Sequence, residues 1–304
     1  MIDLKTTIRS LTLKNPVILA SGVCGYGDAY KDFYSPSLLG AVVTKGISLK
    51  PKAGNPPPRI WETDAGIINS IGLENIGLEK FINEKLPQVA KTGAEIIVNI
   101  FGETEEEFFE LAERLDSQKG IKALELNLSC PNVRKGGIEF GRDPEQVKRI
   151  MAGVRKRTHL PIWVKLSLSR ADPTPIAKIA EGEGADAIVL TNTLRAMAVD
   201  LKSKKPALGA ITGGLSGPAI KPVALAGVFD LVGEISIPVI ACGGVFDFKD
   251  ALEFLLLGAK AVEVGTCVFA DPFAPLKIIE GIKNYLEEKK ISSLEQWIGA
   301  IEIE

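Results

Sequence analysis

The residues best suited to chemistry lie between Leu124 and Asn132, where a strand-like pattern stops among small polar side chains. Leucines alternate there with Glu125 and Asn127, which is the pattern of a strand. The pattern ends at Pro131, which has no N–H group to donate to a sheet. The hydrogen-bonding and reactive side chains at this point are Asn127, Ser129, Cys130 and Asn132. They indicate either the edge of an active site or, because unpaired cysteines are commonly buried, a turn with a structural thiol.

Other predicted strands also end in polar residues. Together the strand ends carry two lysines, three asparagines and one thiol beside the proline, with neither a carboxylate nor a histidine; these are Lys45, Lys165, Asn99, Asn127, Asn192 and Cys130. An asparagine side chain both donates and accepts, so it can bind ring imide groups, and a lysine supplies a positive point charge. The set predicts a pocket for a planar, amide-rich, anionic ligand. A flavin ring and a pyrimidine both fit this description.

Glycine turns follow the last two predicted strands, at Cys242-Gly243-Gly244 and at Gly265-Thr266. Bare backbone N–H groups in such turns can approach phosphate oxygens, and this corner of an α/β barrel commonly binds phosphate. A phosphate next to a ring pocket indicates FMN as the cofactor. Because Cys242 stands beside the phosphate corner, we expect it to pack rather than to react.

The elements that must position these residues alternate regularly along the chain. Short apolar segments predict eight strands, at Val17–Ala20, Gly40–Lys45, Glu95–Ile100, Ala123–Leu128, Ile162–Leu166, Ala187–Thr191, Val239–Ala241 and Ala261–Val264. Helical segments between them include Thr104–Gln118, Asp143–Arg157, Pro173–Glu183, Lys221–Glu234 and Lys249–Leu257. This alternation predicts an α/β protein, a single (β/α)8 TIM barrel domain spanning residues 1–304.

Local signals support the helix bounds. Thr104 followed by three glutamates resembles a capping box, and Asp143 and Asp172 each precede a proline, as helix N-caps often do. Glycines after helices predict left-handed C-caps at Gly93, Gly120, Gly184 and Gly258. Two long segments, Pro51–Asn75 and Arg195–Gly217, exceed a minimal barrel, and we expect them as insertions over the C-terminal face of the strands, above the active site.

Composition excludes several classes of function. The 304 residues have a net charge of -2 and are 46% hydrophobic, so a nucleic-acid-binding surface is not expected. Four scattered cysteines and the single histidine, His159, predict no metal site and fit a reducing cytoplasm. His159 lies at a strand start, away from the strand ends, so we expect it to be structural. We see no signal-peptide core and no apolar run long enough to span a membrane.

The motifs together resemble the class 1 dihydroorotate dehydrogenases, from about residue 3 to residue 285. The resemblance is carried by Ala20-Ser-Gly22, Thr44-Lys-Gly46, Asn69-Ser-Ile-Gly-Leu73, Asn127-Leu-Ser-Cys-Pro-Asn132, Lys165, Asn192-Thr193, Gly213-Gly-Leu-Ser-Gly-Pro-Ala-Ile220, Gly243-Gly244 and Gly265-Thr266. The motif that begins at Gly213, together with Gly136-Gly137 after the cysteine, is most similar to class 1B, the NAD-dependent type.

The resemblance implies a role for each matching residue. It implies FMN binding by Ala20, Ser21, Lys45, Gly46, Asn99, Asn127, Lys165, Thr191, Gly217, Gly243, Gly244, Gly265 and Thr266. It implies binding of dihydroorotate or orotate by Lys45, Asn69, Ser70, Ile71, Gly72, Leu73, Asn127, Asn132, Asn192 and Thr193. Cys130 would be the catalytic base, and Val133–Gly141 a lid over the substrate.

The implied reaction is the FMN-dependent oxidation of (S)-dihydroorotate to orotate in pyrimidine biosynthesis. A hydride passes to FMN N5 and a proton to Cys130. In class 1B, electrons continue to NAD through a partner subunit with FAD and a 2Fe-2S cluster, in a heterotetramer that contains a dimer of the catalytic chain. Such a cluster needs grouped thiolates, which this chain lacks, so the partner would carry it. No nucleic acid and no membrane is implied as a partner.

Alternatives from the same and other classes remain at this point. A class 1A enzyme would use fumarate, a dihydropyrimidine dehydrogenase would act on a related ring, and a tRNA dihydrouridine synthase usually adds a helical RNA-binding domain. A non-redox phosphosugar barrel or a non-catalytic scaffold would leave the thiol among amides unexplained. The chain also departs from the family pattern in two places, at Leu166-Ser-Leu-Ser-Arg-Ala-Asp172 and at Arg195.

Overall fold

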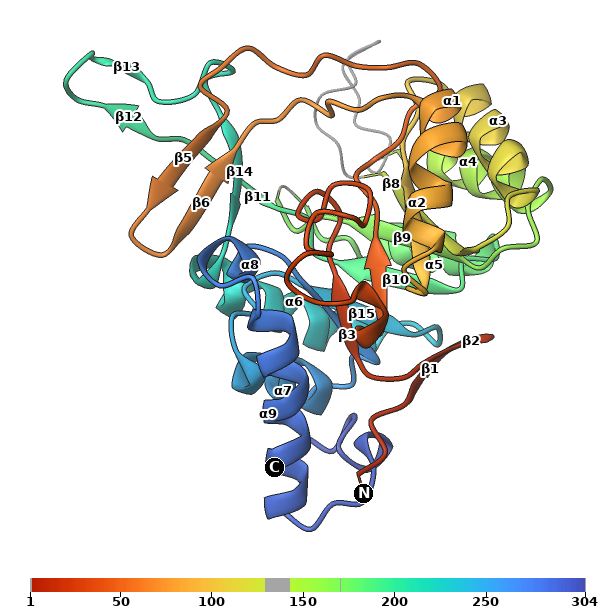
Figure 1. The fold of residues 1–304 in the computed structure, drawn as a ribbon, viewed down its shortest axis with the longest axis vertical. Helices are drawn as coiled ribbons and strands as arrows, with labels where there is room; N and C mark the ends of the chain where they lie inside the picture. Colours follow the sequence, from red (N-terminus) through yellow and green to blue (C-terminus); the bar gives the residue numbers. More distant parts are fainter. Residues whose placement is uncertain (1, 129–142, 170, 304) are drawn as a thin grey trace.

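The centre of the molecule is a closed barrel of parallel strands (Figure 1). The computed structural model describes residues 2–128, 143–169 and 171–303. In chain order the barrel strands are β3 (Val17–Leu19), β4 (Ala41–Val43), β7 (Ile96–Ile100), β8 (Ile121–Asn127), β9 (Ile162–Leu166), β10 (Ala187–Leu190), β15 (Val239–Cys242) and β16 (Ala261–Val264). Each strand pairs with the next, and β16 pairs back onto β3. The predicted (β/α)8 barrel is therefore confirmed, with strand bounds within two residues of those expected.

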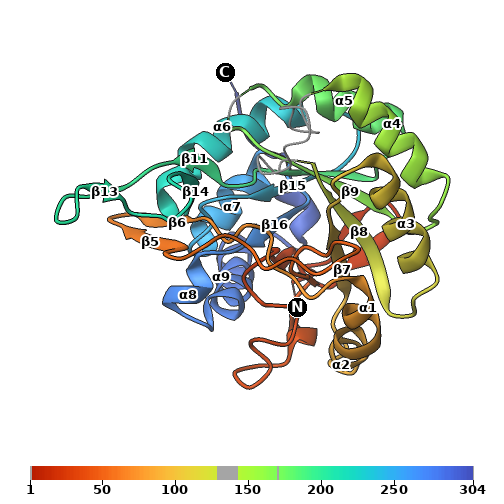
Figure 2. The ribbon, with the colours of Figure 1, turned by 90° about the horizontal axis from the view of Figure 1, so that it is seen from above.

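Helices surround the barrel, as the view in Figure 2 shows. They are α1 (Leu78–Lys80), α2 (Leu86–Ala90), α3 (Glu105–Asp116), α4 (Pro144–Arg155), α5 (Thr174–Gly182), α6 (Lys221–Val232), α7 (Phe248–Leu256), α8 (Cys267–Ala270) and α9 (Ala274–Glu288). A π-helical turn, Phe81–Lys85, joins α1 to α2. In α3 the buried side chains are Phe108, Leu111, Ala112 and Leu115. This spacing of three and four residues presents one apolar stripe to the strands.

The helix caps follow most of the sequence signals, with two corrections. Asp172 was expected as an N-cap before Pro173, but α5 has Pro173 as its N-cap, and Asp172 accepts a hydrogen bond from the N–H of Thr174. Asp143 accepts hydrogen bonds from two backbone N–H groups at the start of α4, as predicted. Thr104 accepts from the N–H of Glu107, but the Glu107 carboxylate accepts from Glu103 instead of returning to Thr104, so the predicted capping box is only half formed. A complete capping box lies at the start of α7, where Asp247 is the N-cap. Asp250 there takes the place of the glutamate expected at the third helical position. The glycines predicted as left-handed C-caps are Gly93, Gly120, Gly184 and Gly258, and all have positive φ.

An N-terminal hairpin closes the lower end of the barrel. Strands β1 (Thr6–Ile8) and β2 (Leu11–Leu13) pair antiparallel, and their buried Ile8 and Leu13 pack in one cluster with inward side chains of the barrel. The barrel members of this cluster are Ile18, Ala41, Val43, Ile97, Ala123, Trp163, Ala187, Val189, Ile240 and Ala261. We call these inward residues, with Ile8 and Leu13, the apolar plug. A second, larger cluster fills the space between strands and helices, so the barrel interior is packed at this end.

The two predicted insertions pair with each other above the barrel. The first supplies β5 (Ile60–Thr63) and β6 (Gly66–Asn69), and the second supplies β11 (Leu194–Ala196) and β14 (Gly213–Ser216). They form one sheet in the order β11-β14-β6-β5, and the short hairpin of β12 (Val199–Asp200) and β13 (Lys205–Pro206) extends beside it (Figure 1). The insertions therefore lie over the C-terminal face, as predicted. Within the described residues, no helix combines the length and apolar character that crossing a membrane requires.

Candidate active site

The C-terminal ends of the strands open into one large cavity of about 1510 Å³. Its walls include all the described residues to which the sequence assigned cofactor or substrate binding. These are Ala20, Ser21, Lys45, Gly46, Asn69, Ser70, Ile71, Gly72, Leu73, Asn99, Asn127, Lys165, Thr191, Asn192, Thr193, Gly217, Gly243, Gly244, Gly265 and Thr266. Cys130, Asn132 and the predicted lid Val133–Gly141 lie outside the described residues. The barrel therefore gathers residues from many strand ends around one space.

One corner of the cavity is built from backbone that only glycine can form. Gly243 and Gly244 follow β15 with φ of 123° and 79°. A Cβ on Gly244 would lie 2.6 Å from the backbone nitrogen of Lys221, at the start of α6. Gly217 has φ of 100°, and a Cβ there would lie 2.7 Å from the Cα of Gly66. The loops after β14, β15 and β16 thus approach closely with exposed N–H groups, which suits a phosphate.

Hydrogen bonds tie this corner to its neighbours. The hydroxyls of Thr266 and Ser216 lie 2.8 Å apart and join the loop after β16 to strand β14. The Thr191 N–H donates to the carbonyl oxygen of Cys242 at 2.6 Å, and the Thr191 hydroxyl accepts from Leu168. These contacts fix the ends of β9, β10 and β15 relative to one another around the cavity.

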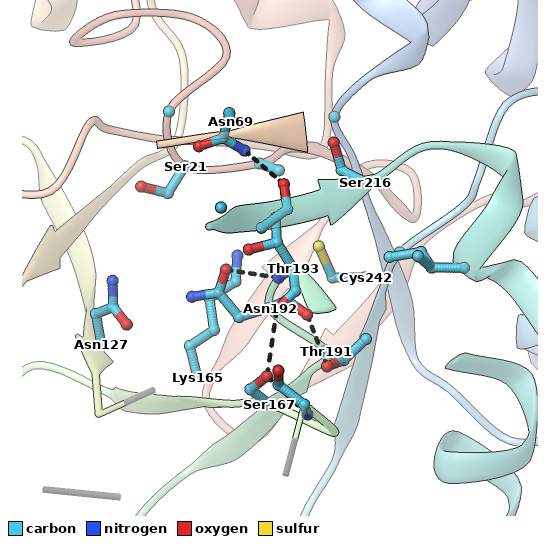
Figure 3. A pocket seen from close by; sticks show the side chains of 18 of the residues that line it. Ser21, Asn69, Asn127, Lys165, Ser167, Thr191, Asn192, Thr193, Ser216 and Cys242 are labelled. Carbon is cyan, nitrogen blue, oxygen red and sulfur yellow. Dashed lines mark hydrogen bonds between the residues drawn. The ribbon is translucent and has the colours of Figure 1, made fainter. Parts of the chain in front are cut away.

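The amide side chains face the cavity from different elements. In Figure 3, Asn127 and Lys165 extend from neighbouring strands, and Asn69 approaches from the opposite side. Asn69 donates to the carbonyl oxygen of Gly214 at 3.3 Å, which ties β6 to β14. Asn192 accepts from the N–H of Thr193 at 2.7 Å. Donors and acceptors therefore face the cavity from the barrel and from the covering sheet.

The loop Asn69–Leu73 has a constrained backbone. Gly72 has φ of 75°, and a Cβ there would lie 2.4 Å from the backbone nitrogen of Asn55. The Asn55 side chain donates to the Ser70 hydroxyl at 2.7 Å, and Leu73 itself has a positive φ of 58°. Within the first insertion, the segment around Asn55 thus holds the loop Asn69–Leu73 in place at the cavity wall.

The two departures from the family pattern contact each other. The backbone N–H of Arg195 in β11 donates to the Ser169 hydroxyl at 2.7 Å, and the Ser167 hydroxyl donates to the carbonyl oxygen of Thr193 at 3.4 Å. Both segments line the cavity. The segment after β9 and the segment at Arg195, which both depart from the family motifs, are therefore joined by hydrogen bonds.

The floor of the cavity holds a charge cluster that sequence reasoning missed. The Lys165 Nζ lies 2.5 Å from Glu263 Oε2 and 3.7 Å from Glu125 Oε1, and Asn99 donates to Glu125 Oε1 at 2.6 Å. Lys165 is 5% exposed, Glu263 1% and Glu125 0%. The expectation of a site without carboxylates was therefore wrong, because the inward residues two positions before the strand ends at Asn127 and Gly265 were not considered. The available signal was alternation, which points a charged residue in a buried strand toward the barrel interior.

The environment shifts the proton affinities of this cluster. Burial opposes the ammonium charge of Lys165, but Cys242 and the adjacent carboxyl groups of Glu125 and Glu263 together outweigh it and raise the pKa of Lys165. Burial, together with the negative charge of Glu263, raises the pKa of Glu125 well above the usual carboxyl range, although Lys165 and Asn99 act in the opposite direction. Lys165 is therefore a permanent cation at neutral pH.

The described cysteines are poor bases. Burial raises the pKa of Cys24, Cys242 and Cys267 to about 12 in each case. Cys242 lines the cavity next to the glycine corner, but at that pKa its thiol stays protonated at neutral pH. This supports packing rather than reaction at Cys242.

The remaining polar residues add no second centre. His159 is exposed and precedes β9, at the end of the strand opposite the cavity. Its backbone N–H donates to the Asp116 carboxylate at 2.6 Å. In residues 2–128, 143–169 and 171–303, no three His, Cys, Asp or Glu side chains form a group that could hold a metal ion. The chemistry of the described cavity thus comes from amides, lysines and glycine turns above a charged floor.

Comparison with known proteins agrees with this geometry. A family model described as dihydroorotate dehydrogenase matches residues 3–286. The chain is 49% identical, over 98% of each chain, to the dihydroorotate dehydrogenase B (NAD(+)) catalytic subunit of Thermodesulfovibrio yellowstonii. It is 48% identical to the protein of the same name from Geotalea daltonii, over 99% of each chain.

A solved structure shares the fold as well. The crystal structure of DHODH from Eimeria tenella in complex with ferulenol superposes with a TM-score of 0.82 and 26% identity, over 98% of this chain and 88% of that one. The match covers the barrel and the cavity together, and it agrees with the family model and with the two bacterial relatives. The chain therefore belongs to the dihydroorotate dehydrogenase family.

Proposed function

We propose that this protein oxidises (S)-dihydroorotate to orotate with FMN as its resident cofactor, in pyrimidine (UMP) biosynthesis. One observation carries the proposal: a single cavity at the C-terminal ends of the strands is lined by all the described residues that the family motifs assign to FMN and substrate. Family membership and the names of the relatives give the reaction its substrate. We also propose that the chain works as one domain.

The residues present fit FMN. Backbone N–H groups around Gly243, Gly244 and Gly265 suit its phosphate, and the positive φ of the first two leaves room for the phosphate oxygens. At the other end of the cavity, the buried Asn99 Oδ1 has no hydrogen-bond partner among the described residues. An unpaired buried acceptor indicates a missing donor, and a flavin ring carries such N–H groups.

Charges and amides in the cavity also fit the substrate. Lys45 and Lys165 supply positive charge for an anionic ring and for a carboxylate, and the asparagines can orient the pyrimidine imides. Bound FMN supplies the acceptor for the hydride from substrate C6. The chain itself must position the two rings and remove the C5 proton. We assign proton removal to Cys130, because a free thiol has an ordinary pKa of about 8.5, close enough to neutral pH for a base.

We propose further that the protein is the catalytic subunit of a class 1B enzyme. The names of the similar proteins from Thermodesulfovibrio yellowstonii and Geotalea daltonii include NAD(+) and "catalytic subunit". Electrons would then pass to NAD through a partner subunit that carries FAD and a 2Fe-2S cluster, in a cytoplasmic heterotetramer built on a dimer of this chain.

A spectral experiment tests the reaction. The purified protein should show the absorbance of an oxidised flavin, and anaerobic addition of dihydroorotate should bleach it. Bleaching by dihydroorotate but not by dihydrouracil would separate this reaction from that of a dihydropyrimidine dehydrogenase. A protein that binds no flavin, or whose flavin is not reduced by dihydroorotate, would contradict the proposal.

A reconstitution experiment tests the electron acceptor. We expect NAD to be reduced only when the FAD-containing partner is added to the protein with dihydroorotate. Efficient turnover with fumarate alone would assign the chain to class 1A instead, without affecting the assignment of substrate and flavin.

A further inference from the structure

One buried ammonium group faces two buried carboxyl groups at the floor of the cavity. Glu263 from β16 contacts the Lys165 Nζ at 2.5 Å, and Glu125 from β8 lies 3.7 Å from the same atom. The two carboxyl groups therefore approach the same nitrogen atom from different strands. Three ionisable groups from three strands therefore meet below the space assigned to the flavin ring.

The charges of this cluster do not balance if both carboxyl groups are ionised. One negative charge would then remain uncompensated where Glu125 and Glu263 are 0% and 1% exposed. An unpaired buried charge is strongly unfavourable, and a buried acid normally keeps its proton instead. The balance can be restored by one additional proton on the pair.

No other described group in contact with the pair supplies the missing positive charge. The titratable neighbours are Cys242 from β15 and Cys24 after β3, and burial raises the pKa of each thiol to about 12. Asn99 from β7 is neutral, and strands β4 and β10 contribute the apolar side chains Val43 and Val189 below the cluster. Among the described residues, the ion pairs of both carboxyl groups are with Lys165 alone.

The hydrogen bonds of the pair lead to the same conclusion. Glu125 Oε2 and Glu263 Oε1 are buried and have no hydrogen-bond partner among the described residues. Two carboxylates cannot satisfy each other, because both only accept. A carboxylic acid and a carboxylate can, since the acid has one O–H group to donate.

We propose that Glu125 and Glu263 share one proton at neutral pH and together act as positioning residues that hold Lys165 under the ring-binding part of the cavity. The shared proton leaves the floor without net charge and fixes Lys165 between two strands. Lys165 then keeps its positive charge for a ring that gains electron density. This last step rests on the proposed flavin function, whereas the shared proton itself does not.

Infrared spectroscopy of the purified flavin-containing protein tests the proton directly. At pH 7 we expect a carbonyl band of a protonated carboxylic acid that shifts in D₂O and disappears in both Glu263→Gln and Glu125→Gln. Glu95→Gln is the matched control, because it removes a lysine-paired carboxyl at the opposite end of the barrel, 3.3 Å from Lys122. Absence of the band, or its survival in either floor variant, would overturn the shared proton.

The pH dependence of unfolding supplies a second, independent test. A folded pKa raised above the unfolded value of about 4.3 adds stability at low pH that is lost as the pH rises toward the folded pKa. From about pH 5 to pH 7, the unfolding constant of the wild type should therefore rise about tenfold more per pH unit than that of Glu263→Gln, which lacks the shared proton. Equal slopes would contradict the proposal. Should Glu263→Gln fail to fold, Glu125→Gln allows the same comparison.

The flavin potential tests the link to Lys165. Glu263→Gln replaces a half-protonated pair by one carboxylate and keeps the floor neutral, so the midpoint potential at pH 7 should stay close to that of the wild type. Lys165→Met removes the positive charge and should lower the potential. A clear rise in Glu263→Gln would show that an uncompensated negative charge had been removed, and the proposal would be wrong. Because the infrared band needs no substrate, its presence without dihydroorotate-dependent bleaching would contradict only the proposed reaction.

Discussion

Two layers of side chains inside the same barrel, two residues apart along five of its strands, differ in polarity. The lower layer belongs to the apolar plug, and the upper layer is the floor of the cavity. The pairs are Ile97 and Asn99 on β7, Ala123 and Glu125 on β8, Trp163 and Lys165 on β9, Ile240 and Cys242 on β15, and Ala261 and Glu263 on β16.

The difference follows from what lies above each layer. Residues of the plug are covered by the N-terminal hairpin and by the floor, so their burial excludes water and stabilises the fold. Most floor residues are as deeply buried, but the floor borders the polar cavity. Strand alternation points both layers inward, so the same backbone serves stability at one level and ligand binding at the next. Substitutions in the two layers should therefore have separable effects.

The largest effect on the reaction, with the least effect on stability, is expected at Cys130, the proposed base. If Cys130 is the base, Cys130→Ala should slow flavin reduction by dihydroorotate about 10²- to 10⁴-fold, the usual contribution of a positioned general base. Flavin content, orotate affinity and stability should change little, because the plug and the floor are intact. Anaerobic stopped-flow absorbance measures the rate, and a nearly normal rate would rule out this role.

In the plug, Trp163→Ala should act on stability alone. Trp163 is fully buried, and loss of so large a core side chain costs about 3–5 kcal/mol of unfolding free energy. The loss should be independent of pH, because no charged group of the floor is altered. Urea unfolding at several pH values measures it, and a strong pH dependence would mean that the two layers are coupled.

At the floor, Lys165→Met should also destabilise the protein, but in a pH-dependent way. Removing the cation leaves the negative charge of two buried carboxyl groups without a positive partner, at a cost of about 3 kcal/mol at neutral pH. Burial and the charge of Glu263 raise the pKa of Glu125, so the cost should shrink as the pH falls and the buried negative charge is neutralised. The same urea titrations measure the difference from wild type. A cost that does not vary with pH would contradict a charged floor.

The smallest effect is expected at Cys242, where the two layers meet on β15. Cys242 lines the cavity, but its raised pKa of about 12 keeps the thiol protonated. Cys242→Ala should cost about 1 kcal/mol of stability and leave dihydroorotate-dependent bleaching near the wild-type rate. Bleaching lost in Cys242→Ala but kept in Cys130→Ala would exchange the roles assigned to the two cysteines.

Much of the fold could be predicted because its signals are local. The strands were predicted from short apolar segments, the start of α4 from Asp143, and the end of α7 from Gly258. Each signal depends only on neighbours in the chain, and the structure confirms all three. The capping box was misplaced because side-chain direction decides whether a box closes. The Glu107 carboxylate turns to the N–H of Glu103, whereas Asp250 returns to the N–H of Asp247. The described residues that were predicted for the site line one cavity, because most of them stand at strand ends, which share one face of a barrel.

By itself, the sequence determined the order of the strands, the glycine turns and the polar strand ends, since each depends on residues close together in the chain. Only the tertiary structure decided that Lys165 meets Glu263, 98 positions later, and that the loop at Asn69 is tied to Gly214. Closing the barrel brings such distant strands together, and no local pattern records which inward side chains then touch. The charged floor is therefore a property of the closed barrel, although each of its residues follows the simple alternation of a strand.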